Sequence, residues 1–159
     1  MIFVTVGSAL PFDRLVRAMG VWAAAHPETE LFAQIGRGEY EPQHMGFDRM
    51  VSPSEFKALN ERAEIIVAHA GMGSVITASE LGKPIVLLAR HASLREHTTD
   101  HQIHTATWLK SRPGIFVADG EAHIDRQIAA GLTAARAADP LPSTAPAAFT
   151  DRLRAALLA

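Results

Sequence analysis

The sequence predicts an α/β fold with a doubly wound, mainly parallel sheet. Short apolar segments alternate along the chain with longer segments of helical spacing, which is the order of strands and helices in such sheets. Several apolar segments lack polar alternation, as expected for strands that are covered on both faces. With 159 residues, of which 48% are hydrophobic, the chain can bury one ordinary core. We therefore expect one main domain over residues 1–138.

Each apolar segment is predicted to form a strand, and each amphipathic segment between two strands a helix. The predicted strands cover residues 2–6, 31–35, 49–51, 65–68, 85–89 and 115–117. The predicted helices cover residues 11–25, 53–62, 74–82, 98–110 and 121–137. The helix at 53–62 has the clearest start, because Ser52 precedes a proline and Glu55 stands at the third helical position, the pattern of a capping box.

The last part of the chain differs in composition. Residues 139–147 are rich in proline and are predicted to form an extended connector. Residues 148–159 are predicted to form a final helix, which we expect to pack on the same domain or on a partner.

Composition narrows the classes of function. Cysteine is absent, so no disulfide or thiolate metal site is expected. The formal net charge of −2 gives no broad basic surface, and we expect no nucleic-acid partner. The opening apolar segment is too short for a signal peptide, and no segment reaches the roughly 20 apolar residues needed to cross a bilayer. We expect a soluble, cytoplasmic chain.

The strongest functional signal is a Gly-x-Gly-Ser turn between an apolar strand and a short helix. The turn consists of Gly71, Met72, Gly73 and Ser74. Bare backbone N–H groups at the start of the helix can bind a phosphate or diphosphate, and glycine lets a ligand approach the main chain because it has no Cβ. The turn therefore predicts a nucleotide site.

Other glycine-containing loops are expected beside this turn. Gly7 and Ser8 follow the first predicted strand, and Gly36 follows the second. Ligands of doubly wound sheets bind outside the carboxyl ends of the strands. These loops and the Gly-x-Gly-Ser turn are therefore predicted to meet at one edge of the sheet.

The turn does not match a dinucleotide fingerprint. Its sixth position is Ile76 rather than a small residue, and no acidic residue follows the next strand near Arg90. We therefore do not expect NAD.

A metal site is a second alternative. His97, His101 and His104 have a spacing that places them on one face of a helix, together with Asp100. A zinc hydrolase stays open on this spacing, but there is no His-Glu-x-x-His pattern, and imidazoles also bind sugars and phosphates. We expect no metal.

Four segments, in this order, resemble a known family. They are Phe3–Gly7 with Phe12–Leu15, Gln34–Gly36 with Tyr40–Pro42, His69–Pro84, and Glu96–Gln102. Over residues 1–118 the chain resembles the C-terminal, donor-binding domain of family 28 glycosyltransferases, the Rossmann-like half of a GT-B enzyme. More narrowly, it is similar to the small subunits of split UDP-sugar transferases: PssE-type exopolysaccharide subunits and the soluble subunit of the dolichol-linked N-acetylglucosaminyltransferase.

The resemblance implies roles for particular residues. The amides of Gly71 to Ser74 would hold the donor diphosphate, and Glu80 would accept hydrogen bonds from the ribose hydroxyls. The backbone of Met50 and Val51 would contact the uracil. The sugar hydroxyls would be bound by Asp100 and Gln102.

The remaining predicted substrate-binding residues are less specific. Gly7 and Ser8 would begin a loop that faces the cleft. His97 and His101 would donate to a sugar or a phosphate. His69 ends the strand before the turn, where a histidine of the core or rim is the alternative.

The resemblance implies a donor-binding subunit of a two-component UDP-sugar glycosyltransferase of polysaccharide or glycolipid biosynthesis. The catalytic base is expected on a separate, membrane-associated partner that resembles the N-terminal half of such enzymes and holds a lipid-linked acceptor. That partner would recruit the chain to the cytoplasmic face of the membrane, and no cofactor would be needed. The alternative is a non-catalytic subunit that binds a nucleotide-sugar or acts as a scaffold.

The donor sugar stays open among a UDP-hexose, UDP-N-acetylglucosamine and UDP-glucuronate. Arg90 and Arg95 favour a carboxylated sugar, since guanidinium groups pair with carboxylates. The alternative for these arginines is a solvated basic loop or a contact with the partner or an anionic lipid.

Overall fold

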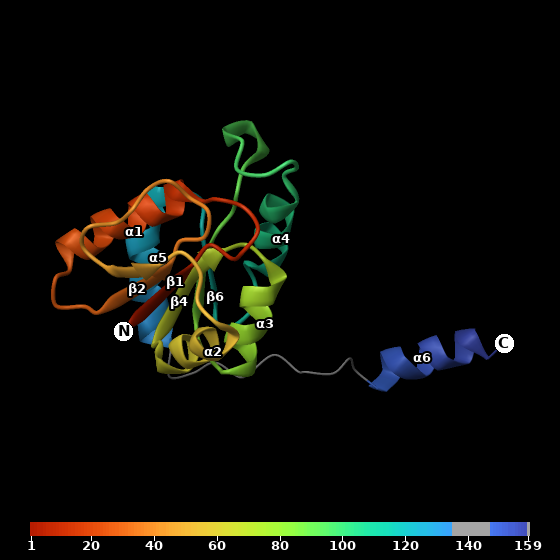
Figure 1. Cartoon of the computed structure of the whole chain (residues 1–159). Coiled ribbons are helices and arrows are strands. Elements are labelled where there is room, and N and C mark those ends of the chain that lie inside the picture. Colours follow the sequence, from red (N-terminus) through yellow and green to blue (C-terminus); the bar gives the residue numbers. More distant parts are fainter. Residues whose placement is uncertain (135–146, 159) are drawn as a thin grey trace.

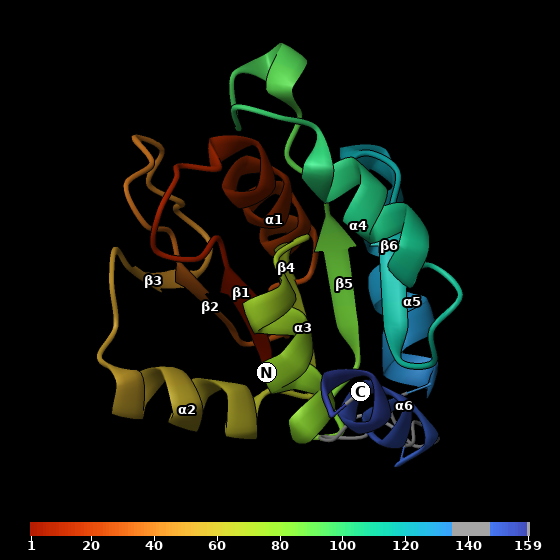
Figure 2. The ribbon, with the colours of Figure 1, turned by 90° about the vertical axis from the view of Figure 1, so that its right-hand side faces the viewer.

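The computed structural model describes residues 1–134 and 147–158 and contains one parallel sheet. Its strands are β1 (Ile2–Thr5), β2 (Leu31–Gln34), β3 (Gly46–Asp48), β4 (Ile65–His69), β5 (Ile85–Leu88) and β6 (Ile115–Ala118). Figure 1 shows the whole chain, and the strands lie in the order β3-β2-β1-β4-β5-β6, which can be followed in Figure 2. The chain thus winds outward from β1 in one direction and then from β4 in the other, which confirms the predicted doubly wound fold.

Helices cover both faces of the sheet. They are α1 (Asp13–Ala25), α2 (Pro53–Arg62), α3 (Met72–Glu80), α4 (His101–Leu109) and α5 (Ile124–Ala134), with the short 3₁₀ helices η1 (Ala92–Leu94) and η2 (Glu121–His123). α1 and α5 pack on one face, and α2, α3 and α4 pack on the other (Figure 2). The sheet therefore lies between two layers of helices.

Every strand except the edge strand β3 contributes side chains to two separate cores. In β1, Val4 packs with Leu15 of α1 on one face, and Phe3 packs with Val75 of α3 on the other. All four of these side chains are fully buried. Full burial of one large apolar side chain contributes about 1.5–3 kcal/mol. Burial on both faces explains why the strands lack polar alternation.

The predicted capping box at the start of α2 is confirmed. Ser52 Oγ accepts a hydrogen bond from the Glu55 amide at 3.2 Å, and the Glu55 carboxylate accepts one from the Ser52 amide at 3.1 Å. The bond from the Ser52 backbone lowers the pKa of the Glu55 carboxyl, because it stabilises the charged form. α2 therefore starts at a fixed place beside the sheet.

The prediction for the third strand was wrong. The strand is β3 at Gly46–Asp48, and residues 49–51 connect it to α2. The apolar pair Met50 and Val51 suggested a strand, but pairing with β2 ends where Asp48 lies opposite Gln34. Helix boundaries differ by up to three residues, and the segment at 121–123 is the 3₁₀ helix η2 rather than the first turn of α5.

The predicted connector at 139–147 lies outside the described residues, except for Ala147. There α6 (Ala147–Leu157) begins, in the place of the predicted final helix. Its residues are exposed, and its packing on this domain or on a partner stays a prediction. No helix in the described part of the chain is both long and apolar enough to span a bilayer.

Candidate functional site

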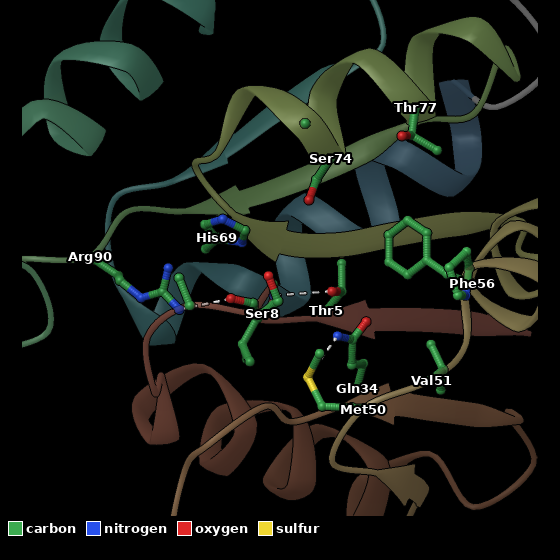
Figure 3. Close-up of a pocket in the computed structure, with 15 residues that line it drawn as sticks. Thr5, Ser8, Gln34, Met50, Val51, Phe56, His69, Ser74, Thr77 and Arg90 are labelled. Carbon is green, nitrogen blue, oxygen red and sulfur yellow. Dashed lines mark hydrogen bonds between the residues drawn. The ribbon is translucent and has the colours of Figure 1, made fainter.

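A cavity of about 540 Å³ opens at the carboxyl edge of the sheet (Figure 3). Its lining comes from the ends of β1, β2 and β4, from the connections after β3 and β5, and from the first turns of α2 and α3. This is the point between β1 and β4 where the winding of the sheet reverses. Doubly wound sheets bind ligands at such a point.

The N-terminus of α3 forms one wall of the cavity. Its N-cap is Gly71, which makes no side-chain capping hydrogen bond. Gly73 and Ser74 line the cavity, and the Ser74 hydroxyl points into it (Figure 3). A Cβ added at Gly73 would meet no atom within 4 Å. The open backbone, the hydroxyl and the helix dipole together can hold a diphosphate.

His69 is wedged between two of the predicted glycines. A Cβ at Gly7 would lie 2.8 Å from His69 Cε1, and a Cβ at Gly71 would overlap His69 Nε2. His69 Nδ1 is buried and has no hydrogen-bond partner. Burial, and then the positive charge of Arg90, lower the pKa of His69 from 6.5 to about 4. The imidazole is therefore neutral at pH 7.

Arg90 follows β5 and holds the loop after β1. Its side chain is 3% exposed, and its Nη2 donates to the carbonyls of Val6 at 2.8 Å and Leu10 at 2.7 Å. The guanidinium also lies over the ring of Phe12, 4.9 Å from its centre. Burial lowers the pKa of Arg90 to about 10, so it remains charged at pH 7.

This arrangement changes the expectation for the two arginines. Arg90 reaches the cavity, but its Nη2 is already bound to backbone carbonyls. Arg95 is exposed, has a left-handed backbone (φ 58°) and does not line the cavity. The pair of guanidinium groups expected beside the sugar is thus not brought together.

An ion pair between Arg14 and Glu96 holds the loop after β5. Glu96 accepts hydrogen bonds from Arg14 Nε at 2.7 Å, from Arg14 Nη2 at 2.8 Å and from the His91 amide at 3.0 Å. The side chains of Arg14 and Glu96 are 15% and 12% exposed. The two-pronged contact therefore ties this loop to α1.

Seven of the fourteen predicted substrate-binding residues line the cavity. These are Gly7, Ser8, Met50, Val51, His69, Gly73 and Ser74. Gly71 and Met72 lie at the start of α3, directly before the lining residues. Glu80 is exposed at the end of α3 and lies outside the lining, but it is one turn beyond Thr77, which does line the cavity.

The predicted residues around 97–102 lie outside the lining and make contacts within the protein. Gln102 Oε1 accepts from the Arg90 amide at 3.2 Å, and Asp100 Oδ1 accepts from the Ala92 amide at 2.8 Å. The rings of His97 and His101 meet edge to face with their centres 4.4 Å apart.

The possible zinc face at His97, His101 and His104 is not assembled as a metal site. Within residues 1–134 and 147–158, no three or more histidine, aspartate or glutamate side chains are arranged to hold a metal ion.

Sequence reasoning missed seven lining residues, which are Thr5, Val6, Ala9, Gln34, Pro53, Phe56 and Thr77. Gln34 is 4% exposed, and its Oε1 has no hydrogen-bond partner. A lone polar residue at the end of an apolar strand was the available signal for Gln34. Thr77 lies one turn after Ser74, and helical spacing alone places both on one face.

Residues 1–135 match the model of the glycosyltransferase family 28 C-terminal domain. The chain belongs to this family. Over 125 residues it is 26% identical to the human UDP-N-acetylglucosamine transferase subunit ALG13. The aligned part covers 72% of this chain and 11% of that protein. The chain thus spans about a tenth of that relative's length. The resemblance to family 28 is confirmed.

Solved structures share the fold. The spinosyn forosaminyltransferase SpnP superposes with a TM-score of 0.59 at 18% identity, over 99% of this chain and 44% of that one. The NMR solution structure of ALG13 gives a TM-score of 0.56 at 17% identity, over 96% of this chain and 93% of that one. At these identities the likeness establishes the fold, which is that of the GT-B glycosyltransferase half.

Proposed function

We propose that this chain is the donor-binding subunit of a two-component UDP-sugar glycosyltransferase. The observation that carries the proposal is the cavity at the switch point of the sheet, with the open N-terminus of α3 at one wall. Preorganised amides there would stabilise the leaving diphosphate as charge develops on it, and this requires no metal or cofactor.

The lining of the cavity supports a site in which this chain binds the donor and a second chain supplies the catalytic base. Transfer needs a base that removes the proton from the acceptor hydroxyl. The lining holds no carboxylate, and its one imidazole, His69, is a weak base because its pKa is lowered to about 4. The base would therefore come from another chain. The human relative is itself named as a transferase subunit.

The partner in this proposal is a membrane-associated protein that resembles the N-terminal half of a GT-B enzyme. It would supply the base and the lipid-linked acceptor, and it would recruit this chain to the cytoplasmic face of the membrane. The product would belong to polysaccharide or glycolipid biosynthesis. UDP-N-acetylglucosamine is the first donor to test, because the related human protein is a subunit of a transferase of that sugar.

Calorimetric titration of the isolated chain with UDP tests donor binding. Glu80 follows the lining residue Thr77 by one turn of α3, so it lies next to the part of the helix that reaches the cavity. We expect saturable binding, weakened about tenfold in Glu80→Ala by loss of hydrogen bonds to a charged group. Glu28→Ala, an exposed change between α1 and β2, serves as the matched control. No binding to the wild-type chain would contradict the proposal.

Co-expression separates the enzyme subunit from the alternative of a non-catalytic nucleotide-sugar-binding or scaffolding subunit. The chain alone should transfer no sugar, and the chain with a partner resembling the N-terminal half should transfer it to a lipid acceptor. Transfer by the isolated chain would contradict the two-component proposal. Equal transfer by the partner with and without this chain would favour the scaffold.

A further inference from the structure

The buried amide of Gln34 lacks a partner for its oxygen. Gln34 ends β2, lies opposite Thr5 of β1 and is 4% exposed. Its Oε1 accepts no hydrogen bond, although the residue lines the cavity. Figure 3 shows this oxygen directed into the space between Thr5 and Phe56. Buried acceptors are rarely left unpaired, which points to a partner that enters from the cavity.

The nitrogen of the amide makes a contact on the other side of the side chain. Gln34 Nε2 donates to the sulfur of Met50 at 3.6 Å. This contact holds the NH₂ group against the connection after β3 and leaves Oε1 facing the cavity. The amide thus presents an acceptor to whatever binds there.

The two ends of the cavity differ in chemistry. Ser74, His69 and Arg90 supply hydroxyl, imidazole and guanidinium groups toward one end. Around Gln34 the walls are the apolar side chains of Val51 and Phe56. A nucleotide has a matching asymmetry, with a charged diphosphate and a flat heterocycle. The diphosphate suits the polar end, which leaves the heterocycle beside Gln34.

We propose that Gln34 determines the specificity for the base, with its Oε1 accepting a hydrogen bond from N3–H of uracil. This inference rests on the proposed function, since it requires a uridine nucleotide in the cavity. In uracil N3 carries a hydrogen, whereas in cytosine N3 is a bare acceptor that would face the Gln34 oxygen. Gln34 therefore selects uridine over cytidine nucleotides by the direction of one hydrogen bond.

The first test changes only the ligand. Calorimetry compares UDP with N3-methyl-UDP, in which a methyl group replaces the hydrogen that Gln34 would accept. We expect N3-methyl-UDP to bind the wild-type chain at least tenfold more weakly, because a buried acceptor loses its partner. Equal affinity for the two ligands would overturn the inference.

The second test changes the residue. Gln34→Met has nearly the same length but no amide oxygen, and the affinities for UDP and CDP are measured for both proteins. We expect the ratio of the affinity for UDP to the affinity for CDP to be about tenfold smaller in the variant than in the wild type. The exocyclic groups of the two bases differ equally for both proteins, so their effect cancels in the comparison of ratios. Gln127→Met on α5, on the opposite face of the sheet, should keep the wild-type ratio.

Each outcome has one meaning. An unchanged ratio in Gln34→Met would overturn the inference even where N3-methylation weakens binding, because another group would then read the base. If the wild-type chain binds UDP but Gln34 proves irrelevant, the proposed function stands and only the inference fails. If the wild-type chain binds no UDP, both fail together.

Discussion

A single side chain, His69, explains why the loops on both sides of it contain glycine. Its ring fills the space that a Cβ would need at Gly7 and at Gly71. Gly7 also has a φ of 75°, which residues with a side chain rarely adopt. The glycines therefore make room for the histidine ring as well as for any ligand. The sequence pattern alone pointed only to the ligand.

The lowered pKa of His69 makes the stability of the fold depend on pH. The unfolded histidine takes up its proton near pH 6.5, but the folded one does so only near pH 4. Between these values the unfolded state binds more protons, so the free energy of unfolding falls as pH decreases. From pH 7 to pH 4.5 this single group should cost about 2–3 kcal/mol.

Urea unfolding at pH 7 and pH 4.5 measures this effect. In His69→Gln the decrease between the two pH values should be smaller than in the wild type by about 2–3 kcal/mol. His104→Gln, an exposed change on α4, should behave like the wild type. A His69→Gln chain that loses as much stability as the wild type would refute the assignment.

At the scale of elements, α2 is held by its first residues. The Ser52 hydroxyl and the Glu55 carboxylate each satisfy a backbone amide at the start of the helix. Ser52→Ala should lower the free energy of unfolding by about 1 kcal/mol, because one capping bond is lost. Chemical denaturation measures this, with Ser111→Ala, an exposed change after α4, as the control. Equal stability of the two variants would show that the cap contributes little.

Strands and helices with a strong sequence pattern could be predicted, but the strand at the edge of the sheet could not. The capping residues fixed the start of α2, and the apolar runs fixed β4 and β5 to within one residue. β3 was misplaced because it is an edge strand of three residues with Phe47 as its one large apolar residue, so its position depends on pairing with β2 rather than on its own composition. Pairing of this kind has no local signal.

The same distinction applies to the site. The turn at 71–74 was found because it is contiguous and its residue types carry their own chemistry. Gln34 and Thr5 were missed because only the sheet brings them beside α3, from strands that precede it by several elements. The contacts of Arg90 with loop carbonyls were not predicted, because Val6 and Leu10 lie 84 and 80 residues before it in the sequence.

At the scale of the whole molecule, every strand pairing is parallel and joins segments far apart in the chain. β1 lies between β2 and β4, with partners some 30 and 60 residues away. Such non-local pairing is typical of slower folding than local pairing gives. The first strand is thus paired on both sides only once the middle of the chain has folded.

The central position of β1 has a thermodynamic consequence for the cavity. Thr5 at the end of β1 and Val6 and Gly7 directly after it form part of the lining, and β1 itself is paired with β2 on one side and with β4 on the other. The amides of β1 should therefore exchange their hydrogens with solvent only through global opening. A nucleotide bound in the cavity would then slow hydrogen exchange in the entire sheet. The free energy of global opening would rise with the logarithm of nucleotide concentration.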